Sequence, residues 1–329
     1  MIQLYTYDVG KGDCLLLRYQ GKSGKYHNIL VDSGTSRFAR KLSQLGQKIA
    51  DSGEQIDLVL ITHVDNDHLG GLFSLERHGA PLHAGRFVIN HPDVEPAMYR
   101  ESDRLLSIRS NDELCKMLSK RGAVVCGAVR GDAICLDGAK LCMIGPAQKR
   151  LSQLFDAAVQ DTPLGGGSDW GAGLETLMNS PLPVRDTSAN NAASIVFVFE
   201  YMGVRLLFTG DGFPEDILEG LRICGMPRTA DGKIRFDAVK LPHHGSARNI
   251  SEEMPCVIDT HRFIICADGT RHPDKLTIAK LLKWYGTVEI FSGRCWWNGN
   301  FMTKEDGERF VETGKLSFYG SERGDVLTW

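Results

Sequence analysis

Short runs of apolar residues, bounded by polar residues, Gly or Pro, recur along the chain and have the length of β-strands. Residues 2–9 and 13–19 have this pattern around residues 10–13 (GKGD), which predict a tight hairpin turn. Residues 58–61 (LVLI) have the β-branched content of a buried strand. Further strands are predicted at residues 28–31, 86–90, 124–125, 133–136, 140–144, 193–201, 204–208, 236–241, 263–267, 288–291 and 316–319.

A helical periodicity appears between these strands. Residues 37–50 place Phe38, Leu42, Leu45 and Ile49 on one stripe, as in a helix that packs against a sheet. The same reading predicts helices that end at residue 77, that cover residues 98–122 and that cover residues 274–285.

Two segments do not follow either pattern. Residues 161–191 are dense in Gly, Pro, Ser and Asp, and we interpret them as an irregular insertion beside the functional site. Residues 287–329 read as a C-terminal extension in which Trp296 and Trp297 look exposed. We find no core of a second domain, so the chain is interpreted as one domain of residues 1–329.

Composition narrows the class of protein. Of the 329 residues, 42% are hydrophobic and 24% are charged, which is ordinary for a globular protein. The net charge of −3 argues against a strongly basic nucleic-acid-binding surface, though not against a local basic groove. The nine cysteines are scattered and contain no Cys-x-x-Cys pair, which indicates reduced thiols in a cytoplasmic protein. No apolar run reaches the length of a membrane span.

The densest candidate chemistry follows the strand at residues 58–61. Within six residues the chain offers His63, Asp65, Asp67 and His68, and a Gly pair comes shortly after. Imidazole and carboxylate groups crowded this closely are typical of a metal site. An acidic turn that caps a helix is the plain alternative, but capping needs one Asp and not this density.

Two more carboxylates lie at predicted strand ends. Asp211 stands between two glycines after residues 204–208, which suits a carboxylate that must approach metal ions closely, although a plain turn Asp is the alternative. Asp32 follows residues 28–31 and is either a metal ligand or the N-cap of the helix that starts near residue 37.

These residues resemble the signature of the metallo-β-lactamase-fold hydrolases, His-x-His-x-Asp-His followed by Gly-Gly. Here the pattern is His63-x-Asp65-x-Asp67-His68, so a carboxylate replaces the second His of the family. A harder, more anionic site shifts the preference from Zn²⁺ toward Mn²⁺ or Mg²⁺ without excluding Zn²⁺.

Several motifs are more similar to the hydrolase domain of ComEC-type competence proteins. They are D-V-G-x-G-D at residues 8–13, D-x-G at residues 32–34 and K-x-P-H-H-G-S at residues 240–246. Two departures accompany them: two residues separate Asn190-Asn191 from Ser194, and Arg271 replaces the glycine of a G-H-P motif. Phosphorylcholine esterases of the same superfamily, in which an Asp binds metal at the place of Asp32, are also similar.

The resemblance implies a fold and a site. The fold is α/β (α+β), an αββα sandwich of two mixed β-sheets with outer helices. The site holds two divalent metal ions, Zn²⁺ or Mn²⁺ with Mg²⁺ also compatible. The implied ligands are Asp32, His63, Asp65, Asp67, His68, Asp211 as the bridging carboxylate, and one of His243 and His244, for which His243 is preferred.

The resemblance also implies an activity. Water activated by the metals would hydrolyse a phosphodiester, with DNA, a nucleotide or another small phosphoester as substrate. The alternative is a non-catalytic binding module that has lost a metal through Asp65. The catalytic residues are expected to be Asp67, which would orient the water or take up its proton, together with His244 and His272; Asn191 and Ser246 are expected to contact substrate.

Overall fold

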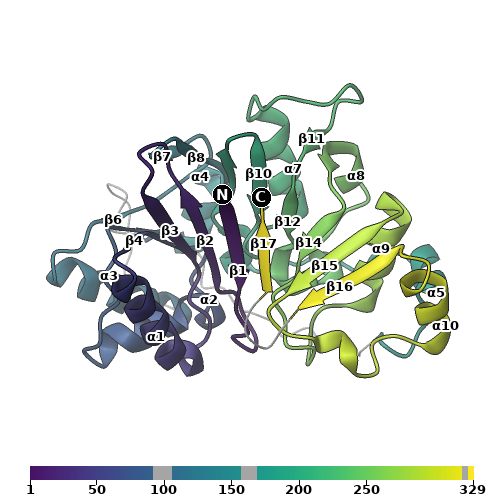
Figure 1. The fold of residues 1–329 in the computed structure, drawn as a ribbon, viewed down its shortest axis with the longest axis horizontal. Helices are drawn as coiled ribbons and strands as arrows, with labels where there is room; N and C mark the ends of the chain where they lie inside the picture. Colours follow the sequence, from purple (N-terminus) through teal and green to yellow (C-terminus); the bar gives the residue numbers. More distant parts are fainter. Residues whose placement is uncertain (92–105, 157–168, 321–324) are drawn as a thin grey trace.

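Two mixed β-sheets lie face to face at the centre of the molecule, and helices cover their outer faces (Figure 1). This computed structural model describes residues 1–91, 106–156, 169–320 and 325–329. The predicted arrangement of two mixed sheets with outer helices is confirmed.

The first sheet has seven strands, and it is antiparallel on one side and parallel on the other. Its antiparallel part contains the two ends of the chain, which pair side by side, and its parallel part begins where β3 meets β4. In spatial order the strands are β17 (Asp325–Thr328), β1 (Ile2–Thr6), β2 (Leu15–Gln20), β3 (Tyr26–Val31), β4 (Ile56–Ile61), β5 (Arg86–Ile89) and β6 (Val125–Cys126).

The second sheet has eight strands and the same division into parallel and antiparallel parts. Its strands are β16 (Leu316–Gly320), β15 (Val288–Ser292), β14 (Arg262–Ile264), β12 (Ala238–Lys240), β10 (Val204–Phe208), β9 (Val196–Tyr201), β8 (Ala139–Gly145) and β7 (Ala133–Leu136). The strands β11 (Ile234–Arg235) and β13 (Ile258–Asp259) form a small separate sheet. The strands β9 and β10 form a hairpin across Met202-Gly203 and are paired from Val204 opposite Tyr201 to Phe208 opposite Phe197.

The helices are divided between the two outer faces (Figure 1). Beside the first sheet lie α1 (Ala39–Asp51), α2 (Asn66–Arg77) and α3 (Leu106–Lys120). Beside the second sheet lie α5 (Leu174–Asn179), α7 (Pro214–Ile223), α8 (Met254–Val257) and α9 (Lys275–Tyr285). The other helices are α4 (Gln148–Asp156), α6 (Ala189–Ala192) and α10 (Lys304–Asp306). The chain also contains 3₁₀ turns at Ser36–Phe38, Pro242–Gly245, Ala247–Asn249 and Trp296–Asn298 and a π turn at Gly307–Val311.

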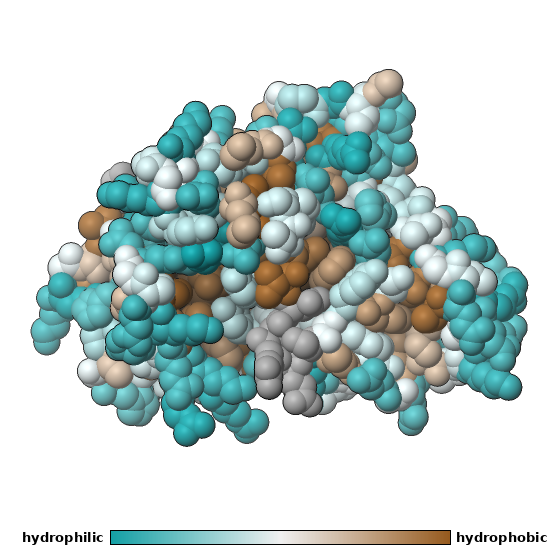
Figure 2. All heavy atoms as spheres, viewed as in Figure 1, coloured by the Kyte–Doolittle hydropathy of each residue, from teal (hydrophilic) through white to brown (hydrophobic). Residues whose placement is uncertain are grey.

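The strand β4 shows why the sequence folds into these layers. Leu58 and Leu60 point into the core between the two sheets, whereas Val59 and Ile61 pack against the helices outside. A strand buried on both faces needs a continuous apolar run, and residues 58–61 supply one. Polar side chains cover most of the face seen in Figure 2, with apolar side chains gathered near its centre.

Two sequence-based expectations differ from the structure, and a third is tested only over part of its length. The connection between β1 and β2 is not a tight turn: it is a loop of residues 7–14 closed by Tyr7 N donating to Cys14 O, because it reaches toward α2. The predicted irregular insertion contains α5 and α6, while its residues 161–168 lie outside the described residues. The predicted helix 98–122 is α3 from Leu106, and residues 98–105 lie outside the described residues as well.

The C-terminal residues are part of both sheets. β15 and β16 extend the second sheet in parallel, and β17 pairs with β1 in the first. Trp296 is buried, contrary to its expected exposure, because it packs edge-on against Phe301 and Phe318 with ring centroids 4.9 and 5.8 Å away. Every helix in the described part of the chain is too short or too polar to cross a membrane.

Candidate metal centre

The candidate site lies where strands of both sheets end. Asp32 follows β3, His63 follows β4, Asp211 follows β10, and the pair His243-His244 follows β12. These strands lie in the parallel parts of their sheets, with Val31 opposite Leu60 and Leu207 opposite Val239, so their carboxyl ends share one edge. Ligand sites of α/β sheets gather at such an edge.

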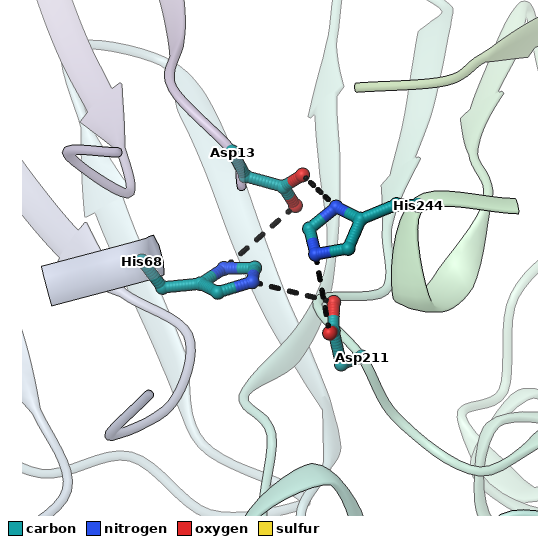
Figure 3. Close-up of side chains that lie close together, drawn as sticks. All are labelled: Asp13, His68, Asp211 and His244. Carbon is teal, nitrogen blue, oxygen red and sulfur yellow. Dashed lines mark hydrogen bonds and ion pairs between the residues drawn. The ribbon is translucent and has the colours of Figure 1, made fainter. Parts of the chain in front are cut away.

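Asp211 is the centre of the site (Figure 3). The Nε2 atom of His68 lies 3.5 Å from its Oδ1, and that of His244 lies 3.5 Å from its Oδ2. The Nε2 atoms of His63 and His243 each lie 3.8 Å from Oδ2. Four imidazoles from two sheets therefore point the same ring nitrogen at one carboxylate.

Each imidazole is held from behind through its other nitrogen. The Nδ1 atom of His68 lies 2.9 Å from Asp32 Oδ2, and that of His244 lies 3.1 Å from Asp13 Oδ1. The rear partner of His63 is the Thr62 hydroxyl at 3.1 Å, and that of His243 is the Asn249 amide oxygen at 3.0 Å. An acceptor at Nδ1 keeps a proton there, so Nε2, which faces Asp211, is the nitrogen of each ring that can bind a metal.

The atoms that face inward have no hydrogen-bond partner within the described part of the chain. This holds for the buried Nε2 atoms of His63, His68 and His244 and for Asp211 Oδ1. Buried polar atoms nearly always have a hydrogen-bond partner, so these unpaired atoms indicate a site for a bound ion. Two ligands of a tetrahedral cation stand about 3.4 Å apart when each bond is about 2.1 Å, close to the distances around Asp211. The residues present therefore fit divalent cations.

The carboxylates of Asp67 and Asp65 also lie near the inward-facing imidazoles, each beside different histidines. Asp67 Oδ2 lies 3.4 Å from His244 Nε2, and Asp67 Oδ1 lies 3.9 Å from His68 Nε2. Asp65 Oδ2 lies 3.8 Å from His63 Nε2, and Asp65 Oδ1 accepts from the Asn190 side chain at 2.6 Å. The group thus has two lobes that share Asp211.

Two buried residues that the sequence analysis did not assign to the site belong to it. Ligand atoms of Asp13, His68, Asp211 and His244 all lie within 4.8 Å of one another. Lys240 forms an ion pair with Asp13, and its Nζ lies 3.6 Å from Asp211 Oδ1. Both residues stand in the quoted motifs, at the end of D-V-G-x-G-D and the start of K-x-P-H-H-G-S, but a lone Asp or Lys there gives no sign of burial.

Asp32 lies behind His68 and not among the inward-facing atoms, in contrast to the expected ligand role. Its Oδ1 accepts from Thr62 N at 2.7 Å, and its Oδ2 is shared between Thr62 Oγ1 and His68. It is not an N-cap either, because residue 35 caps the following 3₁₀ turn.

The two expected substrate contacts are also engaged inside the protein. Asn191 is buried and donates through Nδ2 to Asp186 Oδ2 at 2.7 Å, on the rear side of His243. Ser246 is buried, and its Oγ accepts from Arg248 N at 3.3 Å as the cap of a 3₁₀ turn. Both residues therefore support the loop around His243.

His272 lies at the rim of the site. Its ring centroid is 5.2 Å from that of His243, and its Nδ1 is 3.7 Å from Asp274 Oδ1. It does not join the atoms that surround Asp211, whereas both His243 and His244 do. His244 is the more deeply buried of the pair, since its side chain is 8% exposed and that of His243 is 27% exposed.

The charges of the site favour an additional cation. Burial, together with nearby His68, lowers the pKa of His63 to about 3. Burial also opposes charging of His68 and His244, but the nearby carboxylates, Asp211 first among them, together outweigh it and raise the pKa of both rings, to about 10 for His244. Without a metal, protons on these rings balance the buried carboxylates. Bound cations can take over that balance.

The backbone around the site is strained. Asp32, His243 and His244 have φ angles of 58°, 48° and 55°, in the left-handed region that non-glycine residues rarely adopt. Each such residue costs of order 1–3 kcal/mol and persists only where its surroundings hold it. Three such residues in one site indicate that the fold keeps their side chains in these positions despite the loss of local stability.

The sequence model of the metallo-beta-lactamase superfamily matches residues 7–253, about three quarters of the chain. The chain belongs to the metallo-beta-lactamase superfamily. The match includes the loop of Asp13, the His63–His68 segment, Asp211 and the two histidines after β12. No curated protein sequence matches the chain significantly.

Solved structures of low sequence identity are similar to this chain. The metallo-beta-lactamase fold protein YhfI from Bacillus subtilis is 9% identical over the whole of both chains, with a TM-score of 0.46. Zn²⁺-bound PqqB from Methylobacterium extorquens is 14% identical over 95% of this chain and 87% of its own, with a TM-score of 0.42. CmlA, a diiron β-hydroxylase from Streptomyces venezuelae, is 14% identical over all of this chain and 54% of its own, with a TM-score of 0.44.

Proposed function

We propose that this member of the metallo-beta-lactamase superfamily is a hydrolase that cleaves phosphodiester bonds with two divalent cations. The observation that carries the proposal is the convergence of four imidazole Nε2 atoms on Asp211 from both halves of the fold. Each of these rings has an acceptor at Nδ1, which is the arrangement that prepares histidines to bind a metal.

The two lobes suggest two cation positions that share Asp211. One would be held by Asp67, His68 and His244, and the other by His63, Asp65 and His243, each with an oxygen of Asp211. This assignment differs from the one expected from sequence, since it uses both His243 and His244 and places Asp32 behind His68. The second position contains one more carboxylate than the family pattern, which favours Mn²⁺ or Mg²⁺ over Zn²⁺ there.

Different residues of the chain would then have different roles in hydrolysis. Bound divalent cations supply a water molecule of lowered pKa and neutralise charge on the phosphoryl oxygens. Asp67, whose side chain is 34% exposed, is placed to orient that water or accept its proton. His272, at the rim beside His243, is placed to contact the substrate or to protonate the leaving oxygen.

The substrate class rests on the motifs. The chain has the ComEC-type patterns at residues 8–13, 32–34 and 240–246, and this resemblance supports a phosphodiester such as DNA or a nucleotide. The nine cysteines lie within the described residues and none forms a disulfide, which supports a reducing, cytoplasmic location for this activity.

The experiment that tests the proposal combines metal analysis with turnover. Purified protein should contain about two divalent metals per chain and hydrolyse bis-p-nitrophenyl phosphate. Exhaustive chelation should abolish this hydrolysis, and Mn²⁺ should restore it at least as well as Zn²⁺. A comparison of a dinucleotide with single-stranded and double-stranded DNA would then define the substrate.

Two outcomes would contradict the proposal. Hydrolysis that survives exhaustive chelation would exclude the metal mechanism. Protein that binds neither Mn²⁺ nor Zn²⁺ and has no hydrolytic activity would instead support a binding module that has lost its metals.

A further inference from the structure

A buried ion pair lies behind the candidate site, and the proposed hydrolysis makes no use of it. Lys240 and Asp13 are each 1% exposed, and the Lys240 ammonium contacts Asp13 Oδ2. Lys240 also donates to the carbonyl oxygen of Gly210 at 2.9 Å. The pair joins β12 of the second sheet to the loop that follows β1 of the first.

The pair contacts His244 and Asp211, two residues of the proposed cation position that also includes Asp67 and His68. Asp13 uses its two oxygens differently: Oδ2 meets Lys240, and Oδ1 accepts from His244 Nδ1 at 3.1 Å. The Lys240 Nζ atom also lies 3.6 Å from Asp211 Oδ1. Lys240 is therefore linked to His244 through Asp13 and to Asp211 directly.

Asp13 has the chemistry of a competing ligand. Its carboxylate lies within 4.8 Å of ligand atoms of His68, Asp211 and His244, so a modest rotation would bring it to a cation. The Lys240 ammonium opposes this rotation because a buried carboxylate that leaves its partner loses several kcal/mol. With Oδ2 held by Lys240, Oδ1 stays in place to accept from His244.

We propose that Lys240 is a positioning residue of the metal centre: it holds Asp13 as the acceptor for His244 Nδ1, so that His244 presents Nε2 to the cation. This inference rests on the proposed function only in that His244 is a metal ligand. It concerns the ion pair and its effect on metal binding, not the substrate.

The test uses Co²⁺, whose absorption spectrum reports its ligands, and titration calorimetry of the metal-free protein. Lys240→Met leaves the buried Asp13 carboxylate without its lysine partner, and Lys240→Met combined with Asp13→Asn removes both charges. We expect both variants to bind at least one Co²⁺ about 10–100-fold more weakly, with an altered spectrum, because loss of an outer hydrogen-bond partner typically costs that much. The double variant is the decisive one, since it buries no unpaired charge.

A second buried lysine provides the matched control. Lys275 of α9 is fully buried and pairs with Asp306 of α10 at 2.7 Å, and neither residue belongs to the candidate site. Lys275→Met combined with Asp306→Asn should change thermal stability to a similar degree. Co²⁺ affinity and the Co²⁺ spectrum should remain those of the wild type.

The outcomes separate this inference from the proposed function. Wild-type protein that binds no Co²⁺ would contradict the proposed function itself. Wild-type binding together with unchanged affinity and spectrum in the double variant would overturn the role of Lys240 alone. If neither variant folds, ¹⁵N-histidine NMR of the Zn²⁺-loaded wild type decides, with His244 assigned from the spectrum of His244→Gln: a proton on Nδ1 with none on Nε2 supports the proposal, and a proton on Nε2 overturns it.

Discussion

At the scale of single residues, the hydrogen-bond partners at the Nδ1 atoms of the four histidines matter as much as the carboxylate that their Nε2 atoms face. The rear partners are of different kinds: a hydroxyl for His63, carboxylates for His68 and His244, and for His243 the Asn249 amide, with the Asp186 carboxylate 3.3 Å from the same nitrogen. A carboxylate partner makes an imidazole a stronger ligand than a neutral partner does. The position that contains His68 and His244 should therefore bind its cation more tightly than the position that contains His63 and His243.

The departure at Asp65 gives a direct test of metal preference. Asp65→His restores the ligand type of the family and removes one negative charge from the second position, so the preference for Zn²⁺ should rise. The quantity to measure is the ratio of Zn²⁺-supported to Mn²⁺-supported hydrolysis at matched metal loading. We expect this ratio to increase by about tenfold or more, the scale of one softer ligand.

The matched control for this variant is Asp51→His, on the exposed side of α1, where Gln47 donates to Asp51. Its ratio should equal that of the wild type. An unchanged ratio in an active Asp65→His protein would show that Asp65 does not contact metal. If the variant is inactive with both metals, the number of Zn²⁺ and Mn²⁺ ions bound per chain gives the same comparison.

At the scale of elements, the loop between β1 and β2 is built to touch α2. Gly12 has a φ of +104°, and a Cβ atom on it would lie 1.9 Å from the carbonyl oxygen of Asp67. The next residue, Asp13, donates its backbone N–H to that same carbonyl at 3.3 Å. Only glycine permits this close approach, which places Asp13 behind His244.

Gly12→Ala should therefore damage both the loop and the metal centre. The added methyl group must push the loop away from Asp67, so we expect metal affinity to fall by at least tenfold and the free energy of unfolding to fall by about 1–3 kcal/mol. Titration calorimetry and denaturant unfolding measure the two effects.

Gly10→Ala is the control in the same loop. Gly10 also has a left-handed φ, of +75°, but a Cβ atom there would meet nothing within 4 Å. It should cost about 1–2 kcal/mol of backbone strain and leave metal affinity unchanged. Equal metal affinities for the two variants would contradict the role of the contact between Gly12 and Asp67.

Most elements were predictable from sequence because their signals are local. The apolar run of β4, the alternation of β9 and the glycine turn after it depend on neighbours in the chain. The positions of Asp13, Lys240 and Trp296 depend on contacts between distant segments: Asp13 and Lys240 are 227 positions apart and still form one ion pair. For the same reason, the sequence could nominate Asp32, Asn191 and Ser246 for the site but could not place them behind it.

At the scale of the whole molecule, the candidate site joins the two halves of the fold at the edge where strands of both sheets end. Asp67 and His68 belong to α2 beside the first sheet, whereas Asp211 and His244 follow strands of the second. A cation held by all four would connect the two halves of the fold. Because unfolding separates these residues, a bound metal should stabilise the folded chain and not only its active site.

Removal of metal should therefore lower the melting temperature of the whole chain. A ligand present at 100 times its dissociation constant stabilises the native state by about 2.7 kcal/mol, which corresponds to a shift of several degrees in a protein of this size. Wild-type protein freed of metal by dialysis should regain this shift when Mn²⁺ is added. Asp211→Ala, which removes the carboxylate shared by both positions, should not respond to Mn²⁺ at the same concentration. A wild-type melting temperature that is independent of Mn²⁺, measured where calorimetry shows the sites to be filled, would mean that the cations do not join the two halves.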